Sequence, residues 1–537
     1  MTAVAQHAAA PAPPLRRDRR RWGWAVAGLL LVGWSVAGTG VLDGPVLNPA
    51  GAATAGRFLS AALHPELDAD LLAVLAGSTL VTVAYAVLGA ALSVLAGALG
   101  APLVSRTAWG RGRGGWLVAR GLLALPRGLH EAVWGLLLLN VLGLDPWVAV
   151  LAIAIPFGAI TAKVFADLLD EVPRGGYDAL RTAGACRVTA TLYGLLPPAA
   201  GGLLSYSFYR LECAVRSAVV LGLIGAGGLG YQLALSFSSL RWEQVWTTVY
   251  ALAALCLLAD VAGRAVRRRV AAPSPATAPR DPVLTAAVAT VVVLVVWAGW
   301  YLALSPAALF SARTREGLGY VLRAAWPPAT DAGLLADVWA AALVTVQMSV
   351  LAIAVATPGA VALAALAARP SGPAGPVRHA AGALTRLALL LLRAVPPPVW
   401  ALVLLFVLLP GVLPGALALG VYTLGVLGRL VGEAVEETGR RPREVLRAVG
   451  APAPASWLYG TLPALTGPVL ALALYRWEVT VRDTVLVGLL GAGGLGVLLS
   501  AGTASFDWPA VATVLAAIVV LTFLVDLVSD RARAALR

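Results

Sequence analysis

The sequence predicts an all-α, polytopic membrane protein in which about twelve transmembrane helices form two tandem six-helix units. Three observations lead to this fold class. Of the 537 residues, 59% are hydrophobic and 12% are charged, whereas soluble domains carry about twice that charged fraction. Apolar stretches of roughly 20 residues, the length that crosses a bilayer, recur along the chain. Finally, the second part of the chain repeats the first in sequence.

Six apolar stretches precede a Pro- and Ala-rich segment, residues 271–282, and six follow it. The first set lies near 23–42, 73–103, 117–143, 147–167, 197–222 and 244–263, and the second near 283–304, 338–368, 387–413, 415–432, 463–488 and 510–528. The segment between them has a composition typical of linkers. We therefore expect a tail over 1–22, a first unit over 23–263, a linker over 264–282, a second unit over 283–530 and a tail over 531–537.

The basic residues predict the topology. The net charge is +13, and arginines gather in short clusters between apolar stretches, a pattern typical of the positive-inside rule rather than of a nucleic-acid-binding surface. With six spans per unit these clusters share one side; they include Arg16, Arg17, Arg19, Arg20, Arg21, Arg106, Arg111, Arg113, Arg174, Arg181, Arg187, Arg531, Arg533 and Arg537. Both termini and the linker are therefore predicted to be cytoplasmic. Residues 305–336 depart from the pattern, since their arginines fall on the outer side, and we expect an interfacial helix there.

Little in the sequence points to catalysis or to a metal. Cys186, Cys213 and Cys256 have the spacing of neither a disulfide framework nor a zinc site. A lipid-modifying membrane enzyme would need clustered His, Asp or Ser, but the four histidines are scattered. The sequence lacks the Gly-x-x-x-x-Gly-Lys-[Ser/Thr] phosphate loop. We therefore expect no cofactor in this chain.

The repeat is strongest over residues 178–230, which align without a gap with 444–496, with 25 identities in 53 positions. The offset is 266 residues, and the same offset pairs Arg57 with Arg323, Thr79 with Thr345, Arg127 with Arg393 and Trp134 with Trp400. Because each unit holds an even number of spans, the two repeats run parallel. We expect a pseudo-twofold axis along the membrane normal.

One polar loop recurs between the fourth and fifth spans of each unit. It begins with an acidic residue, reaches a glycine six residues later, and ends in Leu-Pro. A short helix with an acid and an arginine can dock as a rigid peg, while glycine allows a sharp turn after it. The residues concerned are Asp178, Arg181 and Gly184 in the first unit and Glu444, Arg447 and Gly450 in the second.

This loop resembles the "EAA" loop of bacterial ABC importer permeases. The resemblance implies a type I importer-like fold, in which each loop inserts into one of two cytoplasmic ABC ATPase subunits, and these subunits bind ATP and Mg²⁺. It further implies that an extracytoplasmic substrate-binding lipoprotein or periplasmic protein delivers the substrate. It also implies the bacterial cytoplasmic membrane as the location. The alternatives are a loop helix that anchors only at the membrane surface, and an ion-coupled secondary transporter that uses Glu131, Glu212 or Glu478. Two matched loops favour the importer, because a secondary transporter has no ATPase to dock.

Charged residues inside the fifth spans carry a second resemblance. The sequences Tyr209-Arg-Leu-Glu-Cys-Ala-Val-Arg216 and Tyr475-Arg-Trp-Glu-Val-Thr-Val-Arg482, each followed by Gly-Ala-Gly-Gly-Leu-Gly, look like the phosphonate-type permease family. That family implies import of phosphonate, phosphite or phosphate. Charges at this depth are costly and suggest function. We expect Arg210, Arg216, Arg476 and Arg482 to form a positive field that draws an oxyanion.

A purely structural role for these charges remains the alternative. Glu212 with Arg216, and Glu478 with Arg482, are four residues apart and can form ion pairs on one helix face. Arg210 and Arg476 have no obvious partner in their own helix.

The third spans and the glycine turns complete the candidate pathway. Arg127 and Arg393 lie beside prolines inside their spans, where a kink commonly faces protein or a cavity. His130 and Glu131 could form a proton relay, but a snorkelling or helix-capping role is the favoured interpretation. The glycine turns are read either as a gate or hinge near the outer face or as a simple helix break; their residues are Gly225, Gly227, Gly228, Gly491, Gly493 and Gly494.

Overall fold

The computed structural model describes residues 19–41, 44–49, 51–109, 113–271, 281–369, 375–409, 411–439 and 441–536. Most of the predicted N-terminal tail, Arg111, residues 272–280 of the linker and Arg537 lie outside these ranges. Over the described residues the structure is helical, apart from one isolated antiparallel bridge between Leu47 and Leu408. The predicted all-α fold class is confirmed.

The first unit contains α1 to α12 and two π-helical segments. Their bounds are α1 Arg19–Ala37, α2 Gly51–Ala61, α3 Ala69–Val104, α4 Arg106–Trp109, α5 Arg113–Gly128, α6 Glu131–Leu142, α7 Trp147–Glu171, α8 Gly175–Thr182, α9 Arg187–Ala190, the π-helical Thr191–Leu195, α10 Leu196–Leu221, the π-helical Gly222–Ala226, α11 Gly228–Ser238 and α12 Trp242–Ala271.

The second unit repeats this order in α13 to α24. Their bounds are α13 Pro282–Tyr301, α14 Pro306–Leu309, α15 Ala312–Ala324, α16 Ala332–Ala367, α17 Pro376–Ala394, α18 Pro397–Val407, α19 Val412–Glu437, α20 Arg441–Ala448, α21 Ala453–Gly460, α22 Leu462–Gly488, α23 Leu495–Ala504 and α24 Trp508–Leu536. The helix predicted on the outer side within 305–336 is present as α15.

Among the described residues, seven helices are long and apolar enough to cross a membrane, or up to eleven if each bent helix pair is one span. The remaining predicted span corresponds to α1, whose apolar part is shorter. Both predicted third spans are broken, by 82° between α5 and α6 and by 91° between α17 and α18. The indole of Trp134 donates to the carbonyl of Pro126, and that of Trp400 to the carbonyl of Leu392, both at 3.2 Å. These tryptophans satisfy carbonyls that the breaks leave free.

The first helix of each unit packs on the other unit. Helix α13 packs against α3 and α12, and α1 packs against α16 and α24. Ala298 of α13 is fully buried in the apolar core formed by α3, α7 and α10. Val36 of α1 packs on the core of the second unit, beside Met348. The predicted unit boundaries therefore hold along the sequence, but in space the first helix of each unit packs with the other unit; we call α1 and α13 the exchanged helices.

The structure corrects the offset of the repeat near the start of each unit. Helices α3 and α16 both have 36 residues, and their bounds differ by 263 rather than 266. Thr82, not Thr79, is the counterpart of Thr345, since Thr82 and Thr345 accept equivalent bonds from Leu229 N–H at 2.9 Å and Leu495 N–H at 3.0 Å. Three extra residues in the second unit, between the end of α16 and Arg393, restore the offset of 266.

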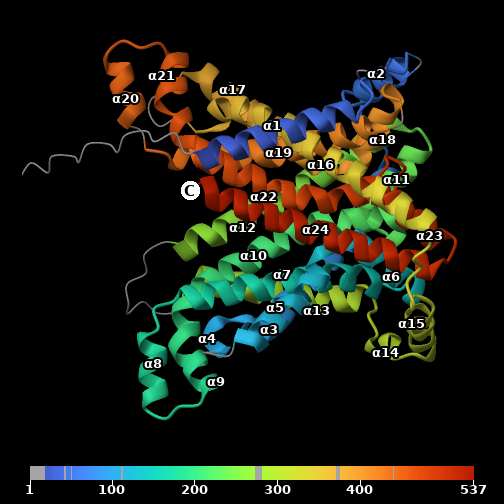
Figure 1. Ribbon diagram of the computed structural model, residues 1–537, viewed down its shortest axis with the longest axis vertical. Helices are drawn as coiled ribbons and strands as arrows, with labels where there is room; N and C mark the ends of the chain where they lie inside the picture. The colour runs from blue at the N-terminus through green and yellow to red at the C-terminus, as the bar shows by residue number, and fades with distance from the viewer. Residues whose placement is uncertain are drawn as a thin grey trace, which may run out of the picture.

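The two ends of the helix bundle differ in what they carry. Figure 1 shows α8 with α9 and α20 with α21 projecting as two arms at the end that also carries the C-terminus. Helices α2, α11, α14, α15 and α23 lie at the opposite end. Both predicted coupling loops are thus on one face of the molecule.

Candidate coupling and translocation sites

The two arms have the local structure that the loop motif predicted. Asp178 and Glu444 lie in the first turns of α8 and α20, where a negative charge is stabilised by the helix dipole. Both acids are exposed. Gly184 and Gly450 follow the helices with φ of +90° and +84°, which residues with a Cβ rarely adopt. The predicted sharp turn after each helix is confirmed.

A second pair of glycines holds each arm close to the next helix, and sequence reasoning missed it. A Cβ on Gly194 would lie 2.8 Å from the backbone nitrogen of Tyr177, and one on Gly460 would lie 2.9 Å from Cα of Arg443. The two glycines are 266 residues apart within the Leu-Tyr-Gly sequence common to both units. In each arm the two helical segments are therefore in close backbone-to-backbone contact.

Arg210 and Arg476 have partners within their own helices, contrary to prediction. Arg210 donates to the hydroxyl of Tyr206, with Nε at 2.9 Å, and lies 4.8 Å from the centre of the Phe157 ring. Arg476 forms an ion pair with Asp483 at 3.7 Å and lies over the ring of Tyr422. Both arginines are 7% exposed. Their charges are partly compensated within their own units.

Glu212 and Glu478 do form ion pairs, but not the predicted ones. Glu212 contacts Arg267 at 3.3 Å and Arg429 at 3.5 Å. Glu478 contacts Arg533 at 2.6 Å. Arg482 instead donates from Nε to the backbone carbonyl of Glu478 at 3.1 Å, and Arg216 donates to the sulfur of Cys213 at 3.8 Å. The expected pairing four residues along the helix is wrong, because helices α12, α19 and α24 supply closer partners.

Asp260 forms the centre of an ionic cluster that joins the two units; we call it the closed cluster. Asp260, which is 2% exposed, accepts from Arg429 at 2.6 Å and from Arg393 at 3.2 Å, and it also pairs with Arg264. Glu212 shares Arg429 with it. Helices α10 and α12 of the first unit are thereby bonded to α17 and α19 of the second. Arg393, predicted to line a pathway, is held by Asp260.

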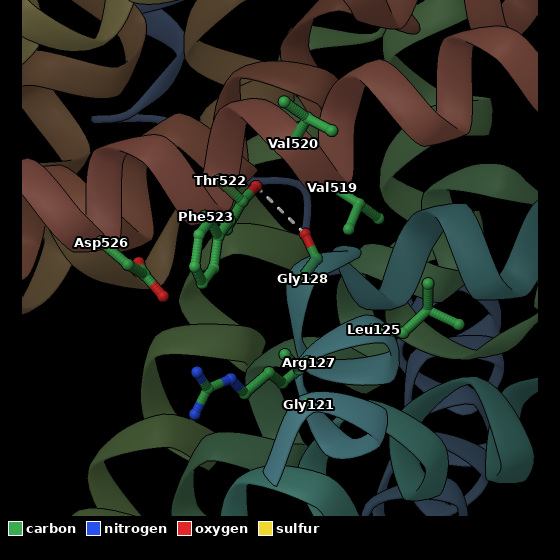
Figure 2. Close-up of a pocket in the computed structure, with 10 residues that line it drawn as sticks. Gly121, Leu125, Arg127, Gly128, Val519, Val520, Thr522, Phe523 and Asp526 are labelled. Carbon is green, nitrogen blue, oxygen red and sulfur yellow. Dashed lines mark hydrogen bonds between the residues drawn. The ribbon is translucent and has the colours of Figure 1, made fainter. Parts of the chain in front are cut away.

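The pseudo-symmetric positions form a second cluster that is not closed; we call it the open cluster. Adding or subtracting 266 gives Asp526 for Asp260, Arg127 for Arg393 and Lys163 for Arg429. Arg127 and Asp526 line a cavity of about 230 Å³ between α5 and α24, and Figure 2 shows them on opposite helices. The space beside Arg393 and Glu212 has a volume of about 10 Å³. The repeat offset relates the two clusters to each other, but only the packing between the units shows that either one exists.

His130 is the N-cap of α6, as the favoured interpretation predicted, and it also meets the second unit. Its Nδ1 accepts from Ala132 N–H at 3.1 Å, so Nε2 carries the proton, and that atom lies 3.4 Å from Asp483 Oδ1 and 3.6 Å from Glu131 Oε2. Ser217 donates to Glu131 at 2.6 Å. Ser217 and Asp483 are 266 residues apart, so the repeat is chemically asymmetric at this contact.

The glycine turns are tightly packed. Gly225, Gly227, Gly228, Gly491, Gly493 and Gly494 all have φ between +75° and +102°, as predicted. A Cβ on Gly228 or Gly494 would lie 2.6 Å from Thr82 Oγ1 or Thr345 Oγ1. The turns thus do more than interrupt a helix, because each fixes the fifth span against the second.

Residues 93–272 and 360–537, more than half of the chain, match the family model described as binding-protein-dependent transport system inner membrane component. The chain belongs to this family. Each matched segment of the permease contains one arm, one fifth span and one glycine turn. The exchanged helices α1 and α13 lie outside both matches. The family consists of transport subunits, so the permease is not an enzyme, and its transport depends on a binding protein.

Three curated relatives are phosphorus-compound permeases. The permease is 29% identical over 417 residues to the phosphate-import permease protein PhnE of Mycolicibacterium smegmatis, covering 77% of this chain and 76% of that protein. It is 35% identical to the phosphite transport system permease protein PtxC of Stutzerimonas stutzeri, over 26% of this chain and 51% of that protein. It is 39% identical to the putative cryptic phosphonate transport system permease protein PhnE2 of Escherichia coli K12, over 22% of this chain and 96% of that protein.

Proposed function

We propose that the permease is the membrane-spanning subunit of an ABC importer that carries an oxyanion of the phosphonate, phosphite or phosphate type into the cytoplasm. The single observation that supports this most is the pair of matched arms at one end of the bundle, in a chain of this family. The names of the relatives support the substrate class. The family supports the importer over the ion-coupled transporter.

In this proposal α8 and α20 each dock into one of two ABC ATPase subunits, and closure of the ATPase pair moves the two units between outward-open and inward-open states. The arms and the C-terminus are cytoplasmic. Exposed apolar side chains beside the acids support docking, since Val445 and Val449 on the second arm are 62% and 75% exposed. An extracytoplasmic binding protein then delivers the anion at the opposite end.

The experiment replaces both acids, in Asp178→Ala with Glu444→Ala, in the full chain co-expressed with its ATPase. Because both side chains are exposed on the arms, the permease should fold and insert normally. Substrate-stimulated ATP hydrolysis and anion uptake should fall together by an order of magnitude or more. Uptake that persists without ATPase coupling would instead support the ion-coupled transporter.

We further propose that Arg216, Arg482, Arg210 and Arg476 supply the positive field along the path. Arg216 lies beside Arg393 of the other unit, and Arg482 donates to the carbonyl of Arg127 of the other unit at 3.2 Å. Both are therefore at the contact between the units, where an alternating-access path has to run.

Arg216→Gln with Arg482→Gln should reduce anion uptake more than Arg210→Gln with Arg476→Gln, because the second pair faces Tyr206 and Asp483. Equal losses of uptake would contradict this ranking.

A further inference from the structure

A cavity lies at the open cluster, between α5 and α24. Its counterpart, the closed cluster, is filled by side chains that neutralise one another. Here the equivalent arginine and aspartate are apart, and about 230 Å³ lies between their helices. The space is an open groove rather than a sealed void, because exposed side chains of α5 and α24 line it. A water molecule takes up about 30 Å³, so the groove has room for a ligand group of several heavy atoms.

The charged side chains that line this cavity, Arg127 and Asp526, would bind an anionic group and a cationic group respectively. Among the described residues, Asp526 Oδ1 is buried and accepts no hydrogen bond. The guanidinium of Arg127 extends from the opposite helix toward the same space (Figure 2). Lys163 of α7 adds positive charge near both groups, but its side chain does not line the cavity. A ligand that fits has an anion for the guanidinium of Arg127 and an N–H donor for the carboxylate.

The rest of the cavity is apolar and faces outward. Leu125 on α5 and Phe523 on α24 line it and are 56% and 57% exposed, and in a membrane protein such side chains face lipid. Asp526 lies 5 to 7 residues before Arg531 and Arg533 on α24, or about 7–10 Å along the helix. That places the charged groups near the level of lipid headgroups at the arm-bearing end.

We propose that the groove between α5 and α24 binds one phospholipid whose headgroup carries both a phosphate and a primary ammonium group, as in phosphatidylethanolamine. The phosphate lies against Arg127, because arginine provides forked hydrogen bonds to phosphoryl oxygens. The ammonium donates to Asp526, and the acyl chains lie along Leu125 and Phe523. Choline headgroups lack the N–H donor, and glycerol headgroups lack the positive charge, so both fit less well.

This lipid would occupy one junction between the units and not the other. In the closed cluster, Arg429 and Arg393 pair directly with Asp260, so no ligand is needed there. At the open cluster, the phosphate and ammonium groups of the lipid pair with the arginine and the aspartate instead. This inference goes beyond the proposed transport function and does not depend on the substrate.

The test purifies the full-length permease from nanodiscs that contain equal amounts of phosphatidylethanolamine, phosphatidylcholine and phosphatidylglycerol, and counts retained lipids by native mass spectrometry. The wild type should retain one phosphatidylethanolamine. Asp526→Asn should weaken its retention roughly tenfold or more, as expected for loss of one charge-assisted hydrogen bond. Leu125→Trp should block retention by filling the groove.

The matched control is Leu99→Trp, which adds the same side chain at an exposed leucine of α3 outside the groove. It should retain the lipid like the wild type, and thermal unfolding of each variant checks that the fold is intact. A folded Leu125→Trp variant that retains phosphatidylethanolamine would overturn the proposal. So would a wild type that prefers phosphatidylglycerol or phosphatidylcholine, or that retains no lipid.

Discussion

At the scale of single residues, Asp260 shows how costly charges are retained inside this permease. It accepts from three arginines, two of which belong to the second unit. A buried ion pair adds little net stability when it is complete, but removing one partner leaves the others uncompensated. Asp260 therefore contributes to stability mainly by neutralising the buried arginines around it.

Asp260→Ala should destabilise the permease by about 3–5 kcal/mol, because Arg393 would be left buried without an ion-pair partner among the described residues, while Arg429 would keep only Glu212 and Glu433. The measurement is thermal unfolding in detergent. Asp526→Ala is the matched control, since it removes the same group at the open cluster, where no arginine contacts it at ion-pair distance among the described residues. Its effect on the midpoint should be clearly smaller, and equal losses would contradict the assignment of one closed and one open cluster.

Gly228 is a second position where adding one atom, a Cβ, should change the stability of the permease. Gly228→Ala places a Cβ 2.6 Å from Thr82 Oγ1 at a φ of +76°. Gly225→Ala is the control, because its φ is +102° but nothing lies within 4 Å of its Cβ. Backbone strain of about 1–2 kcal/mol is common to both variants, and only Gly228→Ala adds a clash. Thermal unfolding should therefore rank Gly228→Ala as the less stable, and the reverse order would show that the turn relaxes freely.

At the scale of elements, the first helix of each arm packs closely against a glycine of the helical segment that follows it, which fixes the position of the arm. Gly194→Ala should push α8 away from its position, since the new Cβ would lie 2.8 Å from the backbone of Tyr177. We expect the ATPase to bind but its hydrolysis to respond less to substrate. Gly175→Ala is the control, because nothing lies within 4 Å of its Cβ. The comparison is substrate-stimulated hydrolysis over basal hydrolysis, and identical ratios would show that the arm does not need this contact.

Sequence reasoning predicted elements well and contacts between elements poorly. Hydropathy and arginine clusters placed the spans, and the loop motif placed α8 and α20, since these signals are local. The pairing of Glu212 with Arg216 failed because helical spacing says which residues share a face, not which neighbouring helix supplies a better partner. Thr79 was matched to Thr345 because one offset was extended over a three-residue insertion. The clusters around Asp260 and Asp526 depend on packing between the units, which periodicity does not contain.

At the scale of the whole molecule, two parallel repeats are joined by contacts that differ from one side to the other. The closed cluster bonds four helices across one junction. The other junction has a groove in the same place. His130 of the first unit contacts Asp483 of the second, whereas Pro396 and Pro397 stand at the positions of the second unit that correspond to His130 and Glu131. A single chain permits such differences, because each half can change without its copy changing.

The exchanged first helices also bear on how the protein is made. Helix α1 is synthesised well before its partner α16, which begins at Ala332, so α1 has to wait in the membrane while residues 38–331 are synthesised. Helix α13 has no such delay, because α3 precedes it. A Cβ on Gly38 would touch the side chain of Gln347, so we expect a Gly38→Cys, Gln347→Cys double variant to form a disulfide between these two positions only in chains that have passed α16. The packing of α1 is then a late step of biogenesis, because it needs helices of the second unit, and a ribosome that stalls in the linker leaves α1 without these partners.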